Sequence, residues 1–280
     1  MLGERSAAAC AVTSARGRLQ LGWTGSNMRL NVASSGDGRD LEGKQTFRHR
    51  SYALVSDSMS SQGSTMSSSR TVPLAPALAG SQGELTMGWT GTDGRLNVWR
   101  LGRGEAGHAV LGERSRQAPS LAAWGGQVTL AWIGRDAHLN VAYAQGGAFT
   151  PAFRWDDTSR TAPAVCMRNR DVVVAWTGTD GHLNLAWSTG GRFLPPVRLP
   201  ETSGRAPALC AAAQAAVLAW TGTDGHINLL SLWPGAAGRP LRLDATTRHA
   251  PALCAHGPDV VLVWTGTDAR INLTRVRPIA

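Results

Sequence analysis

The sequence predicts an all-β protein, a six-bladed β-propeller with four antiparallel strands in each blade. The first observation is a decamer related to WTGTDGHLNL that recurs six times, beginning at Trp23, Trp89, Trp132, Trp176, Trp220 and Trp264. The second is its spacing: successive copies are 43 or 44 residues apart, except for a first gap of 66 residues. The third is that no segment shows a sustained helical period with caps. A fixed period of this length is typical of repeat architectures, and radial repetition of four short strands matches it.

Each repeat is predicted to contain four strands, which in the fourth copy lie at 163–166, 172–176, 183–188 and 194–199. Asp180-Gly181 separates the second strand from the third, and Asp-Gly between apolar runs is a strong hairpin signal. A turn at Gly190-Gly191 separates the third strand from the fourth. The fourth strand contains Pro195 and Pro196, which have no N–H for a sheet ladder, so we expect it at the outer edge of the blade.

The two ends of the chain are expected to meet in one blade. Residues 1–6 (MLGERS) repeat residues 111–115 (LGERS) almost letter for letter, and the latter end a predicted fourth strand. The sequence stops just after a predicted third strand at 271–276. We therefore expect the N-terminal segment to complete the last blade and close the ring, which leaves no open sheet edge.

The first gap contains an insertion of 22 residues, predicted as a polar loop at about 52–72 within a single propeller domain spanning 1–280. Its centre, 56–69, is rich in serine, which is typical of a low-complexity loop. A degenerate remnant of a seventh blade is the alternative. The sequence leaves open whether this segment is a lid or a tether.

Composition excludes several classes of protein. The chain has 280 residues, of which 42% are hydrophobic and 17% charged, so it is too apolar for a disordered chain. No apolar run approaches the length of a membrane-spanning helix. The N-terminus lacks the apolar region of a secretory signal, so we expect a cytoplasmic protein, one exported by a non-classical route, or a fragment of a longer protein.

The repeats resemble bacterial tandem-repeat β-propellers of the AWTGTDxxLNV type. They are also distantly similar to the fucose-binding bacterial propeller lectins, whose blades carry a Gly-Thr-Asp-x-x-Leu hairpin. The resemblance covers nearly the whole chain and implies a lectin-like module. Those lectins have aromatic residues after the hairpin; in this chain Trp99, Tyr143 and Trp187 follow the decamer asparagine by two or three residues. The resemblance implies that these three contact a ligand.

The decamer residues themselves are predicted to be structural. The repeated tryptophan is expected in the core between blades, with sugar stacking as the alternative. The repeated asparagine, from Asn31 to Asn272, is expected to satisfy backbone groups of its turn. The fifth residue of the decamer, which is aspartate in five copies and Asn27 in the first, favours the turn conformation by itself, and we call these aspartates the turn acids. They do not supply the six or more oxygens of a calcium site, so we expect no metal.

The four cysteines, Cys10, Cys166, Cys210 and Cys254, share one repeat position, which is alanine in two other blades. Equivalent positions in neighbouring blades are related by a rotation of about 60°, which places their Cα atoms beyond disulfide reach. We predict buried, unpaired thiols.

Basic residues are predicted to gather on one face of the ring. The net charge is +9, and Lys44 is the only lysine among 28 Lys and Arg residues. The hairpin turns and the loops between blades lie on the same face of a propeller. The turns carry Arg29, Arg95, His138, His182, His226 and Arg270, and the loops carry Arg5, Arg70, Arg116, Arg160, Arg205 and Arg248. These residues form either a multivalent site for acidic groups or a set of solvated loop tips.

The sequence therefore predicts a non-catalytic module that binds carbohydrate, including acidic glycans, through repeated sites on one face. A first alternative is a protein-interaction scaffold that uses the basic face. A second is a sialidase- or glycosidase-like enzyme, because two short segments resemble the sialidase Asp-box: Ser35-Gly36-Asp37-Gly38 and residues 188–191. No catalytic motif is present, so we expect no catalytic residue, no metal and no cofactor. Nucleic acid is not an expected partner, because basic and aromatic residues do not interleave.

Overall fold

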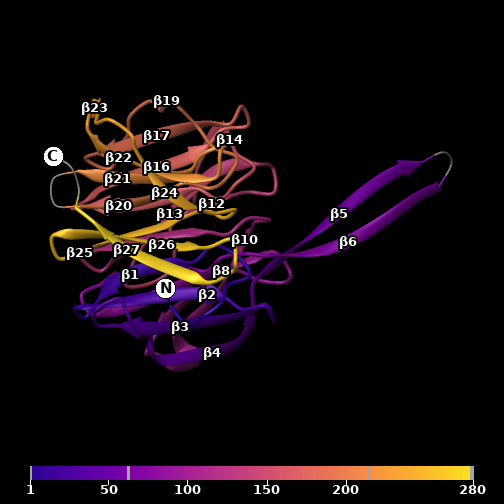
Figure 1. The fold of residues 1–280 in the computed structure, drawn as a ribbon, viewed down its shortest axis with the longest axis horizontal. Coiled ribbons are helices and arrows are strands. Elements are labelled where there is room, and N and C mark those ends of the chain that lie inside the picture. Colours follow the sequence, from indigo (N-terminus) through magenta and orange to yellow (C-terminus); the bar gives the residue numbers. More distant parts are fainter. Residues whose placement is uncertain (1, 62–63, 213–214, 278–280) are drawn as a thin grey trace.

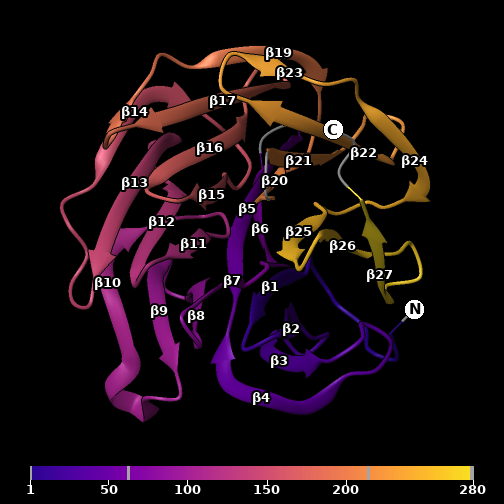
Figure 2. The same cartoon turned by 90° about the vertical axis from the view of Figure 1, so that its left-hand side faces the viewer.

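The computed structural model describes residues 2–61, 64–212 and 215–277. Its strands form six radially arranged sheets around a central axis, which confirms the predicted six-bladed β-propeller (Figure 2). Within the first five blades the strands follow chain order from the axis outwards and pair antiparallel, as β25 (Ala252–His256), β26 (Asp259–Thr265) and β27 (Ile271–Val276) do in the sixth. No helix in the described parts of the chain is long and apolar enough to cross a membrane.

Five of the six innermost strands begin with alanine or serine directly after a proline, and the first begins after Cys10. The six are β1 (Ala11–Ala15), β7 (Ala77–Ser81), β11 (Ser120–Trp124), β15 (Ala164–Arg168), β20 (Ala208–Ala211) and β25 (Ala252–His256). Each contacts the next around the ring, and β25 contacts β1. The ring is therefore closed at its inner wall.

The second and third strands of each blade flank the decamer turn. The second strands are β2 (Arg18–Thr24), β8 (Glu84–Thr90), β12 (Gln127–Ile133), β16 (Asp171–Thr177), β21 (Ala216–Thr221) and β26 (Asp259–Thr265). The third strands are β3 (Arg29–Ser35), β9 (Arg95–Leu101), β13 (His138–Gln145), β17 (His182–Thr189), β22 (His226–Trp233) and β27 (Ile271–Val276). Their alternating apolar residues fill the space between blades on both sides.

The outer strands are more polar and less regular. They are β4 (Glu42–Arg50), β10 (His108–Arg114), β14 (Phe153–Thr158), β19 (Val197–Thr202) and β24 (Leu241–Thr246). A 3-10 helix, η1 (Gly104–Gly107), precedes β10, and the two-residue strands β18 (Arg192–Phe193) and β23 (Ala236–Ala237) precede β19 and β24. The fourth strand predicted at 194–199 was wrong in its start: β19 begins at Val197, because Pro195 and Pro196 cannot donate to the ladder.

The N-terminal segment completes the sixth blade, as predicted. The N–H of Leu2 donates to the Ile271 carbonyl at 2.8 Å, and the Ile271 N–H donates to the Glu4 carbonyl at 3.1 Å. Arg5 forms an antiparallel bridge with Arg270. Residues from both ends of the chain thus share one sheet, and Leu2 is buried among side chains of the first and sixth blades.

The insertion after the first blade was predicted as a polar loop, and this was wrong. Its described residues form a hairpin of β5 (Tyr52–Ser61) and β6 (Ser64–Pro73), which pair from Tyr52–Pro73 to Ser61–Ser64. Residues 62 and 63, which join the strands, lie outside the described residues. The hairpin extends away from the ring (Figure 1). A serine-rich segment can still form strands because the ladder satisfies backbone groups whatever the side chains are.

Candidate functional site

The decamer is a self-contained turn, shown here in the fourth blade. Asp180 Oδ1 accepts the backbone N–H of His182 at 3.1 Å, and Asn184 Nδ2 donates to the His182 carbonyl at 3.0 Å. The Gly178 N–H donates to that same carbonyl at 2.8 Å. A side chain at Gly178 would place its Cβ 2.7 Å from Asp180 Oδ1, which explains the glycine.

The same turn hydrogen bonds recur in all six blades, which confirms that the repeated asparagine is structural. The residue after the turn acid has positive φ, from 63° at Met28 to 82° at Gly181, so glycine is favoured there. The repeated tryptophan is also structural: Trp23, Trp89, Trp132, Trp176 and Trp220 are 1–4% exposed, and Trp264 is half-buried.

The cysteines are unpaired and buried, as predicted. Burial raises the pKa of Cys10 to about 11 and that of Cys166 to about 12, because a thiolate is poorly solvated in the core. Cys10 Sγ lies 3.4 Å from Thr265 Oγ1 of the neighbouring blade. These thiols belong to the inner wall of the ring and are poor nucleophiles.

The loops between blades are hydrogen-bonded to the decamer turns. The Ser203 N–H donates to the Gly181 carbonyl at 2.9 Å, and Thr177 Oγ1 donates to the Arg205 carbonyl at 2.7 Å. Ser203 Oγ donates onward to the Thr221 carbonyl of the next blade at 2.8 Å. Turns and loops therefore lie on one face of the ring, which we call the decamer face.

The basic residues of the decamer turns mostly have partners within their own blade. Nδ1 of His182 lies 3.1 Å from the Leu199 carbonyl oxygen, so its N–H donates a hydrogen bond to the outer strand. His138 and His226 make the same contact in their blades. Arg95 and Arg270 lie 3.7 and 3.8 Å from the turn acids Asp93 and Asp268, respectively.

Arginines from the outer strands neutralise the remaining turn acids. Arg198 contacts Asp180 at 3.0 Å, and Arg154 and Arg242 make the equivalent contacts in their blades. The His182 backbone N–H, and then Arg198, hold the pKa of Asp180 below its ordinary value. The turn aspartates thus offset much of the positive charge predicted for the decamer face. Arg29 is an exception, because its turn contains Asn27 in place of an aspartate.

The loop arginines are arranged differently. Arg116, Arg160, Arg205 and Arg248 are exposed, and none forms an ion pair within the part of the chain that the structure describes. Arg160, Arg205 and Arg248 line one cavity of about 770 Å³ on the propeller axis, which we call the axial cavity. Arg5 is exposed at the closure of the ring, and the Arg70 side chain lies outside the described residues.

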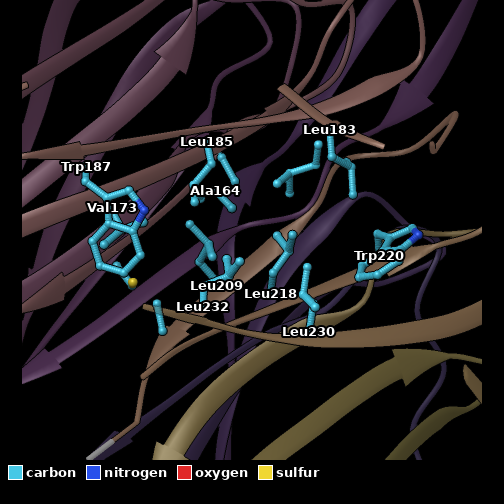
Figure 3. Packing of buried hydrophobic residues seen from close by; sticks show 14 residues of the cluster. Ala164, Val173, Leu183, Leu185, Trp187, Leu209, Leu218, Trp220, Leu230 and Leu232 are labelled. Carbon is cyan, nitrogen blue, oxygen red and sulfur yellow. The ribbon is translucent and has the colours of Figure 1, made fainter. Parts of the chain in front are cut away.

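The three aromatic residues implied by the resemblance lie in the packed junctions between blades. Trp187 is 9% exposed and lies beside Val173 at one end of a buried cluster that includes Leu209, Leu218 and Leu230 of the fifth blade (Figure 3). Tyr143 packs against the fourth blade. Trp99 packs edge-on against Phe47 at a centroid distance of 5.3 Å, and its Nε1 donates to the Gly104 carbonyl.

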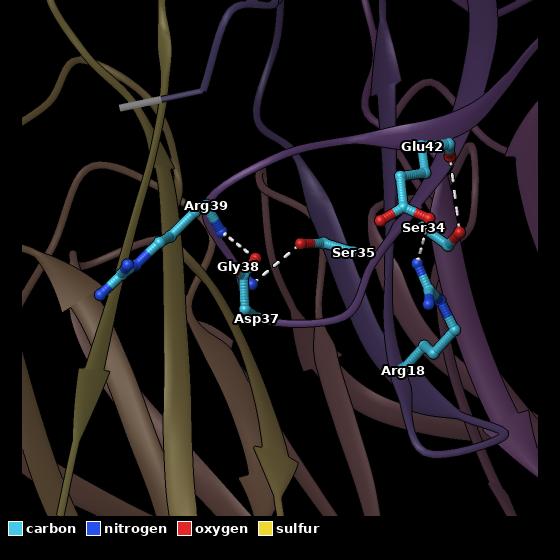
Figure 4. A network of polar contacts seen from close by, with 7 residues as sticks. All are labelled: Arg18, Ser34, Ser35, Asp37, Gly38, Arg39 and Glu42. Atoms are coloured by element: carbon cyan, nitrogen blue, oxygen red, sulfur yellow. Dashed lines mark hydrogen bonds and ion pairs between the residues drawn. The ribbon is translucent and has the colours of Figure 1, made fainter.

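The segment that echoes an Asp-box is the turn between β3 and β4 (Figure 4). The Gly38 N–H donates to Ser35 Oγ at 2.8 Å, and the Arg39 N–H donates to Asp37 Oδ1 at 2.8 Å. The Arg39 hydrogen bond lowers the pKa of the Asp37 carboxyl. Asp37 thus holds a turn together.

A pocket of about 390 Å³ lies between the fifth and sixth blades, near the strand ends remote from the decamer turns. Its wall is mostly apolar and includes Val217, Leu229 and Val260. The half-buried Trp233 offers an aromatic ring, and the exposed Arg239 offers a guanidinium group. An apolar cleft with an aromatic ring and a few polar groups is the usual form of a small-molecule site.

An equivalent pocket of about 360 Å³ lies between the second and third blades. By decamer register, Thr86, Val98 and Val128 occupy the positions of Val217, Leu229 and Val260. Phe149 supplies an aromatic ring and Arg100 a guanidinium group. The repeat therefore places a pocket with an equivalent apolar wall at two junctions, and different repeat positions supply its aromatic ring and its guanidinium group.

One repeat position differs between the two open junctions and two of the filled ones. It is the third residue after the decamer asparagine: Arg100 and Ser231 line the two pockets. At the third–fourth and fourth–fifth junctions the same position holds Tyr143 and Trp187, whose rings pack into the neighbouring blade.

Sequence reasoning missed the residues that line the outer pockets. Trp233, Phe149 and Arg239 lie beyond the decamer, in or after the third strand, where the copies diverge. An available signal was Trp233 itself, one of the tryptophans outside the decamer position. Among the basic and aromatic residues proposed from the sequence, none whose side chain the structure describes lines these two pockets, whereas Arg160, Arg205 and Arg248 line the axial cavity.

Solved structures similar to this one include several lectins. The Aleuria aurantia lectin, solved as a six-bladed propeller with fucose recognition, matches with a TM-score of 0.68 at 8% identity, covering 96% of this chain and 91% of that one. This chain has the same six-bladed β-propeller fold. BP39L lectin from Burkholderia pseudomallei matches with a TM-score of 0.63 at 16% identity, covering 93% and 78%. SapL1 lectin, solved with α-methyl fucoside, matches with a TM-score of 0.63 at 13% identity, covering 99% and 98%. No protein-family model and no curated protein sequence matches the chain.

Proposed function

We propose that this protein is a non-catalytic, lectin-like module that binds carbohydrate at the two outer pockets. The observation that carries the proposal is the recurrence of one pocket at two junctions of a propeller whose structural neighbours are carbohydrate-binding lectins. Each pocket combines an aromatic ring, a guanidinium group and an apolar wall. A sugar ring has an apolar face that stacks on an aromatic side chain and hydroxyls that need polar partners.

Acidic glycans are the preferred ligand class in this proposal. Arg239 and Arg277 are exposed at the fifth–sixth pocket, and Arg100 lies at the second–third pocket. Arg277 lies 3.8 Å from Asp259, whereas Arg239 makes no ion pair among the described residues. A guanidinium group binds carboxylate or sulfate in a bidentate manner. Two weak sites on one molecule would add avidity on a multivalent surface.

A glycan array followed by calorimetric titration tests the proposal. Trp233→Ala and Phe149→Ala should each weaken binding by about tenfold, the loss typical of an anchoring aromatic residue. Trp124→Ala is the matched control, because Trp124 is 40% exposed and lies outside the three cavities described here. A carboxylated or sulfated glycan should bind more tightly than its neutral analogue, and more salt should reduce the difference.

Two outcomes would overturn the proposal. The first is no binding of any neutral or acidic saccharide by the folded wild-type protein. The second is binding that the double variant Trp233→Ala/Phe149→Ala retains unchanged, with a melting temperature equal to that of the wild type.

A further inference from the structure

The axial cavity is a second kind of site, formed once for the whole ring. Six segments that enter the innermost strands line it, and five of them contribute an Ala-Pro pair, at 75–76, 118–119, 162–163, 206–207 and 250–251. The small alanines leave the centre of the ring open, and its volume of about 770 Å³ lies within the range of small-molecule sites.

Charge is distributed unevenly around the cavity. Arg160, Arg205 and Arg248 come from three consecutive loops, and His249 follows the last of them. The segments at 7–12 and 72–78, which form the rest of the circumference together with the loop at 117–121, contribute only uncharged residues. No Asp or Glu lines the cavity in the part of the chain that the structure describes. One side is therefore cationic and the other apolar.

The three loops that carry these arginines are fixed in place. Gln117 Nε2 donates to the Arg160 carbonyl at 2.7 Å, and Thr177 Oγ1 donates to the Arg205 carbonyl at 2.7 Å. Thr221 Oγ1 donates to the His249 carbonyl at 2.8 Å, next to Arg248. Only the arginine side chains need to be ordered when a ligand binds, which limits the entropic cost of binding.

These arginines also differ from those of the outer strands. Arg154, Arg198 and Arg242 each contact a turn aspartate within about 3 Å, so their charge is already paired. The axial arginines form no ion pair among the described residues. Three guanidinium groups without an ion-pair partner, in the same cavity as an apolar wall, match a ligand with an anionic head and an apolar body.

We propose that the axial cavity binds one small amphipathic anion, whose anionic head lies against Arg160, Arg205 and Arg248 and whose hydrocarbon body lies against the Ala-Pro wall. The ligand class is an organic acid of the carboxylate, sulfate or phosphate type. This site is separate from the outer carbohydrate pockets, so its occupancy does not depend on theirs.

Calorimetric titration with octanoate, octyl sulfate and octyl phosphate, each below its micelle concentration, tests the proposal and ranks the three head groups. Octanol is the neutral control. We expect one site per chain, with octanol at least tenfold weaker than the best anion. The triple variant Arg160→Gln/Arg205→Gln/Arg248→Gln should lose at least tenfold in affinity.

A matched triple variant separates site binding from general electrostatics. Arg154→Gln/Arg198→Gln/Arg242→Gln removes the same charge from the same three blades and should bind within twofold of the wild type. Ala162→Phe, which narrows the cavity and leaves the charge unchanged, should also abolish binding, with folding verified by its melting temperature. Equal loss in both triple variants, equal affinity for octanol, more than one site, or no binding of any of the three anions would overturn the proposal. Retention of glycan binding by the axial variant would show that the outer pockets act separately.

Discussion

The fourth–fifth and fifth–sixth junctions are built from nearly identical repeats, yet one is filled and the other is open. Trp187 occupies the first, in a buried cluster with Leu209, Leu218 and Leu230 of the fifth blade. Ser231 takes the same repeat position at the second, beside a pocket of about 390 Å³. At these two junctions, the side chain at one repeat position outside the decamer distinguishes a packed junction from one that contains a pocket.

Emptying the filled junction should have the largest effect. Trp187→Ser removes a ring that is 9% exposed, and such truncations cost about 3–5 kcal/mol because transfer energy and packing are both lost. Urea unfolding should report this loss, whereas Trp124→Ser, at an exposed position, should cost less than about 1 kcal/mol. A loss below about 1 kcal/mol at Trp187 would contradict the packing described here.

The decamer glycine should come next, because it is common to open and filled junctions. Gly178→Ala would place a Cβ 2.7 Å from Asp180 Oδ1 and 3.0 Å from Asn184 Nδ2. One of the turn hydrogen bonds must then lengthen, and we expect a loss of about 1–3 kcal/mol in the free energy of unfolding. Gly204→Ala serves as the control, because no atom lies within 4 Å of its Cβ. Equal stability of the two variants would show that the turn adjusts freely.

Filling the open junction should change binding more than stability. Ser231→Trp places in the fifth blade the ring that the fourth blade already has. We expect the free energy of unfolding to change by less than about 1.5 kcal/mol, since an existing cleft receives the ring. Glycan binding at this pocket should be lost, while the second–third pocket retains its own. Undiminished calorimetric stoichiometry in this variant would place the ligand elsewhere.

The repeat made most of the fold predictable, because the decamer fixes its own turn. Four decamer residues make their contacts within one blade or with the next one: the Asp, the Asn, the glycine and the buried tryptophan. Their roles can therefore be predicted from the repeat alone. The start of β19 was missed because Pro195 and Pro196 interrupt the ladder, and the β5–β6 hairpin was missed because its composition resembles a loop. The outer pockets depend on which side chains of two neighbouring blades face each other across a junction. Ser231 lies beside a pocket at one junction and Trp187 is packed at another, and no local sequence pattern encodes these pairings.

We expect the smallest effect on stability from the titration of His249, on the cationic side of the axial cavity. The half-buried His249 has a pKa below its ordinary value, because burial disfavours the imidazolium ion and Arg205 adds repulsion. The unfolded chain therefore binds this proton at a higher pH than the folded protein does, so stability should fall as pH decreases through the ordinary value of about 6.5 towards the lower folded value. Arg205→Gln removes the repulsion and leaves the burial, so the pKa of His249 should rise but stay below its ordinary value. An NMR titration of the imidazole measures this shift, with Arg160→Gln, from a different loop, as the control. If Arg205→Gln leaves the titration unchanged, the guanidinium group does not face His249, and the charge of the cavity is more dispersed than its lining indicates.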